Sequence, residues 1–142
     1  MLLVDTSVVL DVIEDDARWG HWSQQQLEAA SRRYALLINP VIYAELSIAY
    51  LRIEELEAML ARGGFRVEPI PREALFLAGK VFLQYRRKSG VKAGVLPDFF
   101  IGAHAAVAGI PLLTRDTRRY RTYFPKLALI SPDQPMGTLQ QP

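Results

Sequence analysis

The stretch that decides the fold is Leu2-Leu3-Val4-Asp5-Thr6-Ser7-Val8, at the start of the 142-residue chain. Residues 1–4 form a short apolar run, which is typical of a buried strand, and Asp5 follows directly where that strand ends. Thr6 or Ser7 can cap the helix that comes next. A buried strand that ends in an acid and leads into a helix is the first unit of an α/β domain.

The rest of the chain repeats this alternation. Further strands are predicted in the apolar runs at residues 35–38, 110–114 and 127–130, and at residues 65–70, where Phe65, Val67 and Ile70 are candidate packing residues. Helices are predicted at residues 17–33, 40–51, 52–62, 71–88 and 97–108. Residues 89–96 are predicted to form a loop, and residues 115–123 a polar loop or short helix. Strands that alternate with helices predict a parallel sheet with right-handed crossovers and functional groups outside the carboxyl ends of its strands.

The domain organisation is simple. We predict one domain over residues 1–131 and a flexible tail over residues 132–142, because the last segment is rich in Pro and Gln.

Composition excludes several classes of protein. Half of the residues are hydrophobic, so the chain is not disordered by composition. Cysteine is absent, which excludes disulfides and thiolate metal sites. No apolar run reaches the roughly 18 residues that a membrane-spanning helix needs. The N-terminus lacks the pattern of a secretory signal. We therefore expect a soluble cytoplasmic protein with no membrane contact.

Charge is distributed unevenly along the chain. Residues 80–126 hold ten basic and two acidic side chains, and those two acids are Asp98 and Asp116. Such asymmetry favours a basic surface for a polyanion, because neutralising phosphates releases condensed counterions. A solvated charged face explains the charge count equally well.

Glu45 lies in the predicted helix 40–51, within Val41-Ile42-Tyr43-Ala44-Glu45-Leu46-Ser47-Ile48. Apolar residues point in nearly every direction around this helix, so we expect it to be largely buried. A buried carboxylate needs a partner, because an unpaired charge is costly to remove from water. A salt bridge, or a place at the edge of the helix, explains Glu45 when it is considered alone.

Three other acids lie beside predicted buried elements. Asp5 follows the first strand, Asp98 begins the helix at 97–108, and Asp116 follows the strand at 110–114. Capping or turn formation explains each of them separately. Together with Glu45, they are better explained by a shared cation that turns mutually repelling charges into ligands. Oxygen ligands without cysteine or clustered histidine favour Mg²⁺ or Mn²⁺, which can activate water against a phosphodiester.

These acids and their neighbours resemble the PIN-domain nucleases, and specifically the VapC-type toxins of bacterial and archaeal toxin–antitoxin pairs. The matching segments occur in the same order along nearly the whole chain, to about Ser131. They are Leu2-Leu3-Val4-Asp5-Thr6-Ser7-Val8, Ala44-Glu45-Leu46, Leu96-Pro97-Asp98-Phe99-Phe100-Ile101-Gly102-Ala103-His104-Ala105 and Leu113-Thr114-Arg115-Asp116.

The resemblance implies a PIN-like α/β/α sandwich with a central parallel sheet. It also implies a Mg²⁺- or Mn²⁺-dependent endoribonuclease that cleaves a transfer RNA or ribosomal RNA loop and inhibits translation. Its catalytic metal ligands would be Asp5, Glu45, Asp98 and Asp116, of which Asp116 occupies the least uniform family position. A VapB-type antitoxin that grips the N-terminal helices is implied as a partner, and homodimers are common in the family.

Further residues have supporting roles in this interpretation. Thr6 and Thr114 match hydroxyl positions of the family and can orient a ligand or water, although capping explains each equally well. Basic side chains near the predicted site are candidates for contacts with RNA phosphates. They are Arg86, Arg87, Lys92, Arg115, Arg118 and Arg119.

Aromatic and histidine residues near these positions receive structural interpretations first. Tyr85, Tyr120 and Tyr123 can stack on unpaired bases, but core packing is the preferred explanation. His104 lies roughly 240° around the helix from Asp98, so we assign it to packing or hydrogen bonding instead of metal binding.

Two other functions fit part of the sequence. A catalytically inactive PIN-like module that binds RNA or protein would keep the acids without their chemistry. An aspartyl-phosphate phosphatase or receiver would use Asp5, but the second Asp that such a phosphatase carries two positions later is Ser7 in this chain.

Overall fold

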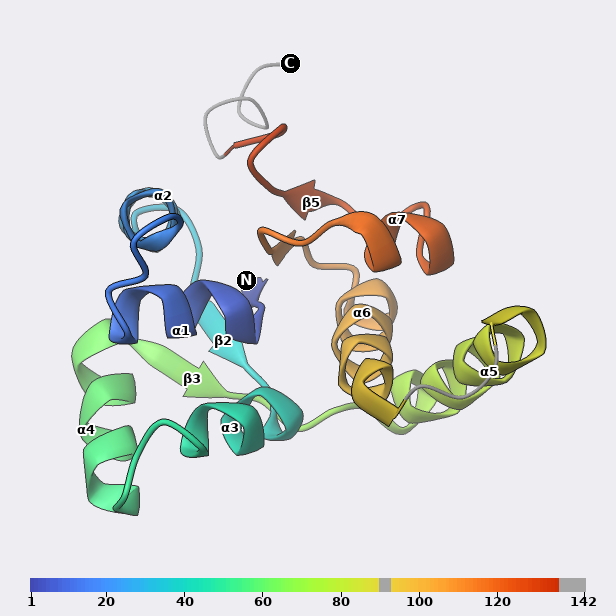
Figure 1. Cartoon of the computed structure of the whole chain (residues 1–142), viewed down its shortest axis with the longest axis horizontal. Coiled ribbons are helices and arrows are strands. Elements are labelled where there is room, and N and C mark those ends of the chain that lie inside the picture. Colours follow the sequence, from blue (N-terminus) through green and yellow to red (C-terminus); the bar gives the residue numbers. More distant parts are fainter. Residues whose placement is uncertain (90–92, 136–142) are drawn as a thin grey trace.

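The computed structural model describes residues 1–89 and 93–135 (Figure 1). Five strands within these residues form one sheet in the order β3-β2-β1-β4-β5, and every neighbouring pair is parallel. The strands are β1 (Leu2–Val4), β2 (Leu36–Ile38), β3 (Phe65–Val67), β4 (Leu112–Leu113) and β5 (Leu129–Ile130). The predicted central parallel sheet is confirmed.

Helices connect the strands and cover the sheet. They are α1 (Thr6–Ile13), α2 (Gly20–Ser31), α3 (Pro40–Ser47), α4 (Ile53–Gly63), α5 (Arg72–Ser89), α6 (Leu96–Ala108) and α7 (Arg118–Tyr123), with a 3₁₀ turn at Ala93–Val95. Figure 1 shows α1 to α4 gathered on one side of the molecule and α5 to α7 on the other. Right-handed crossovers around this strand order give the same arrangement.

The first strand lies at the centre of the sheet. β1 pairs with β2 on one side, where Leu2 is opposite Leu36, and with β4 on the other, where Leu3 is opposite Leu112. The side chains of Leu2, Leu3 and Val4 are fully buried, as expected for a parallel strand covered on both faces. The connection leaves β1 toward β2 and later returns to β4, so a crevice forms where the direction of the connections reverses.

Several element boundaries differ from the sequence prediction, and the strand predicted at 65–70, for example, ends at Val67. The helix predicted at 17–33 begins only at Gly20, because the Asp16 carboxylate accepts hydrogen bonds from the backbone N–H groups of Arg18 and Trp19 and holds a turn there. In the loop predicted at 89–96, Ser89 is the last residue of α5, Ala93–Val95 form the 3₁₀ turn and Leu96 begins α6, while residues 90–92 lie outside the described residues.

The expectation that the helix carrying Glu45 is largely buried is wrong. Only Ile42 and Leu46 of α3 are buried. The helix ends at Ser47, so the apolar residues beyond it lie on a surface turn, where Ile48 is 86% exposed and Leu51 98% exposed. The helical periodicity assumed for residues 48–51 therefore does not apply to them.

The end of the described chain is fastened to the domain. Ser131 and Gln134 form an antiparallel bridge, and Asp133 pairs with Arg121 of α7 at 2.5 Å. Residues 136–142 of the predicted flexible tail lie outside the described residues.

In the part of the chain that the structure describes, no helix has the length and apolar character needed to cross a membrane.

We predict that Gly102→Ala lowers the free energy of unfolding by about 1–3 kcal/mol. A Cβ at Gly102 of α6 would lie 2.5 Å from Cε2 and 2.6 Å from Cδ2 of Phe124. That ring is buried, so it must shift together with the end of α7. Urea unfolding measures the loss.

The control for this substitution is Gly79→Ala in α5. A Cβ there meets nothing within 4 Å, and alanine favours a helix over glycine by about 1 kcal/mol. The control variant should therefore be at least as stable as the natural protein. Equal stability of the two variants would contradict the close packing of α6 against Phe124.

Candidate functional site

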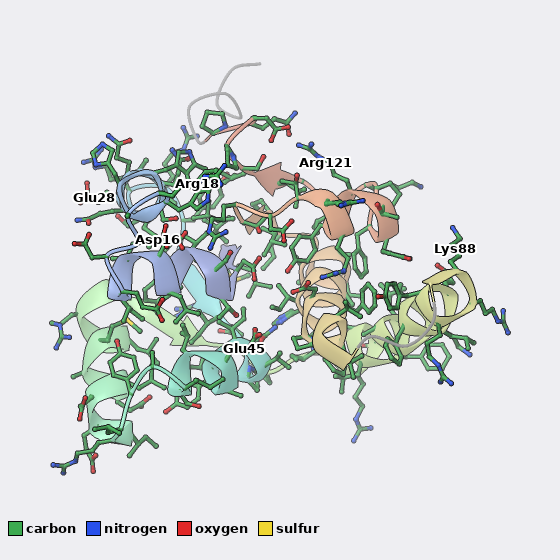
Figure 2. The ribbon with its side chains drawn as sticks, viewed as in Figure 1. Asp16, Arg18, Glu28, Glu45, Lys88 and Arg121 are labelled. Carbon is green, nitrogen blue, oxygen red and sulfur yellow. The ribbon has the colours of Figure 1, made fainter. Side chains whose placement is uncertain are left out.

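A pocket of about 390 Å³ opens beside the carboxyl ends of β1 and β4, and all four predicted acids line it. Asp5 follows β1 and Asp116 follows β4, while Glu45 lies on α3 and Asp98 in the first turn of α6. Figure 2 shows Glu45 on the part of α3 that is nearest the middle of the molecule. Four elements that are distant in sequence thus bring their carboxylates to one pocket.

Asp5 is the most buried of these acids, with 6% of its surface exposed. Its Oδ2 accepts a hydrogen bond from Thr114 Oγ1 at 2.7 Å and another from the Tyr120 hydroxyl at 3.3 Å. Burial raises the pKa of Asp5 to about 7, and the nearby charges of Asp98 and Glu45 add to that increase against the opposing hydrogen bonds. The fold therefore holds a carboxyl group where its ionised form is disfavoured.

Tyr120 of α7 also contacts Asp5. Its side chain is 2% exposed, and burial together with the Asp5 charge raises the pKa of Tyr120 well above its ordinary value. The hydroxyl therefore stays protonated and donates to Asp5. This contact agrees with the preference for core packing over base stacking at Tyr120.

Glu45 is held by the helix that follows β1. Thr6 Oγ1 donates a hydrogen bond to Glu45 Oε1 at 2.6 Å. Burial and the charge of Asp98 raise the pKa of Glu45, while the Thr6 hydrogen bond lowers it. The expected capping role of Thr6 or Ser7 is wrong, because Asp5 occupies the N-cap position of α1 and no side chain makes the cap hydrogen bond.

Asp98 pairs with a guanidinium inside the pocket. Arg119 Nη1 donates to Asp98 Oδ2, and the two residues come from α7 and α6. Burial raises the pKa of Asp98, Arg119 lowers it, and Asp116 raises it further, with a net increase. The positive charge of Arg119 thus offsets only part of the cost of placing this acid here.

Asp116 is exposed and is positioned through its backbone. Its N–H donates to Thr114 Oγ1 at 3.1 Å, and the same hydroxyl donates to Asp5 at 2.7 Å. Thr114, fully buried at the end of β4, therefore joins the two acids that follow the central strands.

A buried polar contact joins the helices that carry Glu45 and Asp98. Asn39 caps α3 by accepting from Ile42 N at 2.9 Å, and its Nδ2 donates to His104 Nδ1 of α6 at 3.2 Å. Burial lowers the pKa of His104, which keeps the acceptor nitrogen unprotonated. The predicted hydrogen-bonding role of His104 is confirmed.

Asp11 is a pocket residue that our sequence analysis missed. It is 3% exposed and accepts hydrogen bonds from Ser23 Oγ at 2.8 Å and from Arg115 Nε at 2.7 Å. The Arg115 guanidinium also lies 5.7 Å from the centre of the Trp19 ring. An acid among the apolar residues of α1 was the available signal, because a buried carboxylate requires a partner.

Two of the predicted RNA-contacting residues line the pocket, namely Arg115 and Arg119. Both are already engaged by carboxylates, Arg115 by Asp11 and Arg119 by Asp98. Arg118 is exposed at the start of α7.

The remaining predicted basic residues belong to the end of α5. Arg86 and Arg87 are exposed in its last turn and do not line the pocket. Arg86 lies 5.9 Å from the centre of the Phe82 ring, and the neighbouring Lys88 points outward in Figure 2. Lys92 lies outside the described residues.

The chemistry of the pocket fits a hard divalent cation, because its four candidate ligands offer carboxylate oxygens. Binding of such a cation would also require the side chains of the pocket to rearrange. Within residues 1–89 and 93–135, no group of three acidic or histidine side chains is arranged to hold a metal ion as it stands, and Asp98 is paired with Arg119. A cation that uses all four acids must therefore draw them together and compete with that guanidinium.

Comparison with known proteins places the chain in a structural context. A family model described as the PIN domain matches residues 2–125. Among curated proteins, no sequence matches the chain.

Solved structures with the same fold are similar over nearly their whole length. VapBC2 from Rickettsia felis, bound to a DNA fragment from its promoter, has a TM-score of 0.70 and 17% identity, covering 92% of this chain and 97% of that one. A toxin–antitoxin complex from Klebsiella pneumoniae has a TM-score of 0.63 and 21% identity, with 93% and 98% covered. FitAcB from Neisseria gonorrhoeae has a TM-score of 0.62 and 20% identity, with 93% and 98% covered.

We predict that Asp5→Asn stabilises the protein at neutral pH in the presence of a chelator. The pKa of Asp5 is about 7 in the folded state and 3.8 in a model peptide, so wild-type stability falls as the pH rises between these values. The gain from Asn is therefore absent below about pH 4 and greatest above pH 7, reaching up to roughly 4 kcal/mol from the 1.4 kcal/mol equivalent to one pKa unit. Unfolding at a series of pH values measures it.

Glu14→Gln is the matched control for the pH series. Glu14 lines the same pocket but is exposed, so removing its charge should change stability little at any pH. A loss of stability in Asp5→Asn above pH 7 would show that this carboxylate supports the fold instead of straining it.

Proposed function

The chain belongs to the PIN domain family, and from that premise we propose that it is a divalent-metal-dependent endoribonuclease acting as the toxin of a type II toxin–antitoxin pair. The observation that carries the proposal is the pocket in which Asp5, Glu45, Asp98 and Asp116 meet. Burial raises the pKa of Asp5, Glu45 and Asp98, and the charges of neighbouring acids add to the increase. A fold gains nothing in stability from such a cluster, whereas a bound cation would reverse the repulsion.

The four carboxylates would hold the ion, and two hydroxyls keep two of them in place. Thr6 holds Glu45 and Thr114 holds Asp5 by hydrogen bonds. When bound, Mg²⁺ or Mn²⁺ would supply charge neutralisation at the phosphate and activation of water. Tyr120 keeps its proton and donates to Asp5, which keeps that carboxylate facing the pocket.

RNA is the proposed substrate, with a transfer RNA or ribosomal RNA loop as the expected class. Arg115 and Arg119 bring positive charge into the acidic pocket, and Arg118 adds to it at the surface. Guanidinium groups beside the reacting centre suit phosphates, since they carry charge and several donors. The unpaired strand of a loop would reach such a recessed site more easily than a rigid duplex.

The proposed protein partner is a VapB-type antitoxin. An apolar pocket of about 680 Å³ lies between α1, α2 and α4, and its lining includes Val9, Val12, Leu27 and Met59. An amphipathic helix can place its apolar face in a groove of this kind. A homodimer is also proposed, since the exposed Ile48 and Leu51 offer apolar surface in the turn that follows α3.

We predict that Asp98→Asn lowers the rate of metal-dependent RNA cleavage by about 100-fold or more, because an essential charge in the reacting site is removed. The measurement uses purified full-length chain, single-stranded RNA, Mn²⁺ or Mg²⁺, and sequencing of the cleaved ends. Growth inhibition on expression without an antitoxin should be relieved in parallel.

Glu73→Gln is the control for cleavage, since Glu73 is an exposed acid in the first turn of α5 and does not line the pocket. It should cleave at the wild-type rate. Cleavage that persists in Asp98→Asn, or in excess chelator, would contradict the proposed metal-dependent site. A folded wild-type chain that cleaves no RNA with either metal favours the inactive binding module.

We predict that Leu27→Glu weakens binding of the antitoxin by at least about tenfold, because it places a charge against the apolar lining of the groove between α1, α2 and α4. Gln25→Glu is the matched control, since Gln25 lies exposed on the same helix outside that lining. Titration calorimetry of the purified chain with the candidate VapB-type antitoxin measures the affinity. Equal affinities for both variants would show that the antitoxin binds to another surface of the chain.

A further inference from the structure

We propose that Arg119 competes with the divalent metal for the carboxylate of Asp98. The Arg119 guanidinium is paired with Asp98, which is one of the four candidate ligands. The inference rests on the proposed metal-dependent function. It assigns to Arg119 a positioning role that acts through Asp98.

The pair is specific within the pocket. Five ion pairs join described residues, and the Arg119–Asp98 pair is the only one of the five that uses any of the four acids. The other arginine in the pocket, Arg115, is held by Asp11. Arg118 precedes Arg119 on the same helix but is exposed and does not line the pocket.

The placement of Arg119 is fixed by its neighbour in sequence. Tyr120 is 2% exposed and its hydroxyl contacts Asp5, so α7 is anchored one residue away from the guanidinium. Two consecutive residues of α7 thus donate hydrogen bonds to two of the acids, Arg119 to Asp98 and Tyr120 to Asp5. Arg119 itself remains about one third exposed, so the side chain can leave the carboxylate without unpacking the helix.

Competition follows from charge and from geometry. Arg119 lends one positive charge to Asp98, which lines the pocket together with the three other acids. A divalent cation would do the same with twice the charge, and two cationic groups on one carboxylate repel each other. Each therefore weakens the binding of the other by the same factor. The consequence is a site that fills at a higher metal concentration than the four acids alone would require.

The test is calorimetric titration of chelator-treated full-length protein with Mn²⁺. Arg119→Gln should bind Mn²⁺ at least about fivefold more tightly than wild type, the lower end of ordinary coupling between two sites. Arg118→Gln removes the same charge from the adjacent exposed position, and it should change the affinity by less than about twofold, because solvent and salt screen that charge.

Thermal unfolding supplies a second measurement on the same proteins. Without metal, Arg119→Gln should unfold at a lower temperature than Arg118→Gln, because Asp98 loses its partner. Saturating Mn²⁺ should raise its unfolding temperature by more than it raises that of the wild type, since tighter binding to the folded state gives greater stabilisation. Arg119→Met, which keeps an aliphatic stem of similar reach, replaces Arg119→Gln if that variant does not fold.

The outcomes separate this inference from the function on which it rests. If wild type binds Mn²⁺ and Arg119→Gln binds no more tightly than Arg118→Gln, the competitor role is overturned and the proposed nuclease stands. If neither wild type nor any variant binds Mn²⁺ or Mg²⁺, the proposed metal site fails and the competitor role fails with it.

Discussion

The structure depends on how it accommodates a buried carboxyl group, Asp5, at the end of its central strand. Burial and the charges of Asp98 and Glu45 oppose ionisation of this group. The hydroxyls of Thr114 and Tyr120 compensate in part by donating to it. Because an uncompensated charge at this depth is costly, the elements around β1 are arranged to supply donors or positive charge to the pocket.

The sheet topology explains why the donors come from different parts of the chain. β1 has β2 on one side and β4 on the other, so the segments that follow these strands meet at one edge. Thr6 at the start of α1 then reaches Glu45, and Thr114 after β4 reaches Asp5. Helix α7 adds Arg119 and Tyr120, and its far end rests on α6 where Gly102 leaves room for the Phe124 ring.

One side of the pocket is held by a separate polar cluster. Asp11 accepts from both Ser23 and Arg115, which ties α1, α2 and the segment after β4 together. The guanidinium of Arg115 also faces the Trp19 ring, a contact that adds a cation–π attraction. Arg115 is therefore paired with an acid outside the four candidate ligands, whereas Arg119 is paired with one of those ligands. The competition with a metal that we propose for Arg119 therefore does not extend to Arg115.

The sequence by itself determined where buried strands lie along the chain: apolar runs marked β1, β2, β4 and β5, and acids after two of these strands marked the edge where Asp5 and Asp116 meet. These features are local, because burial on both faces and the end of a strand leave their mark on consecutive residues. The same approach failed for Glu45, since α3 ends at Ser47 and its apolar neighbours are exposed. Only the tertiary structure decided which groups meet the acids. The pairs Arg119–Asp98 and Arg115–Asp11 join residues 21 and 104 positions apart, and such contacts depend on how the helices pack, which no periodicity in the sequence encodes.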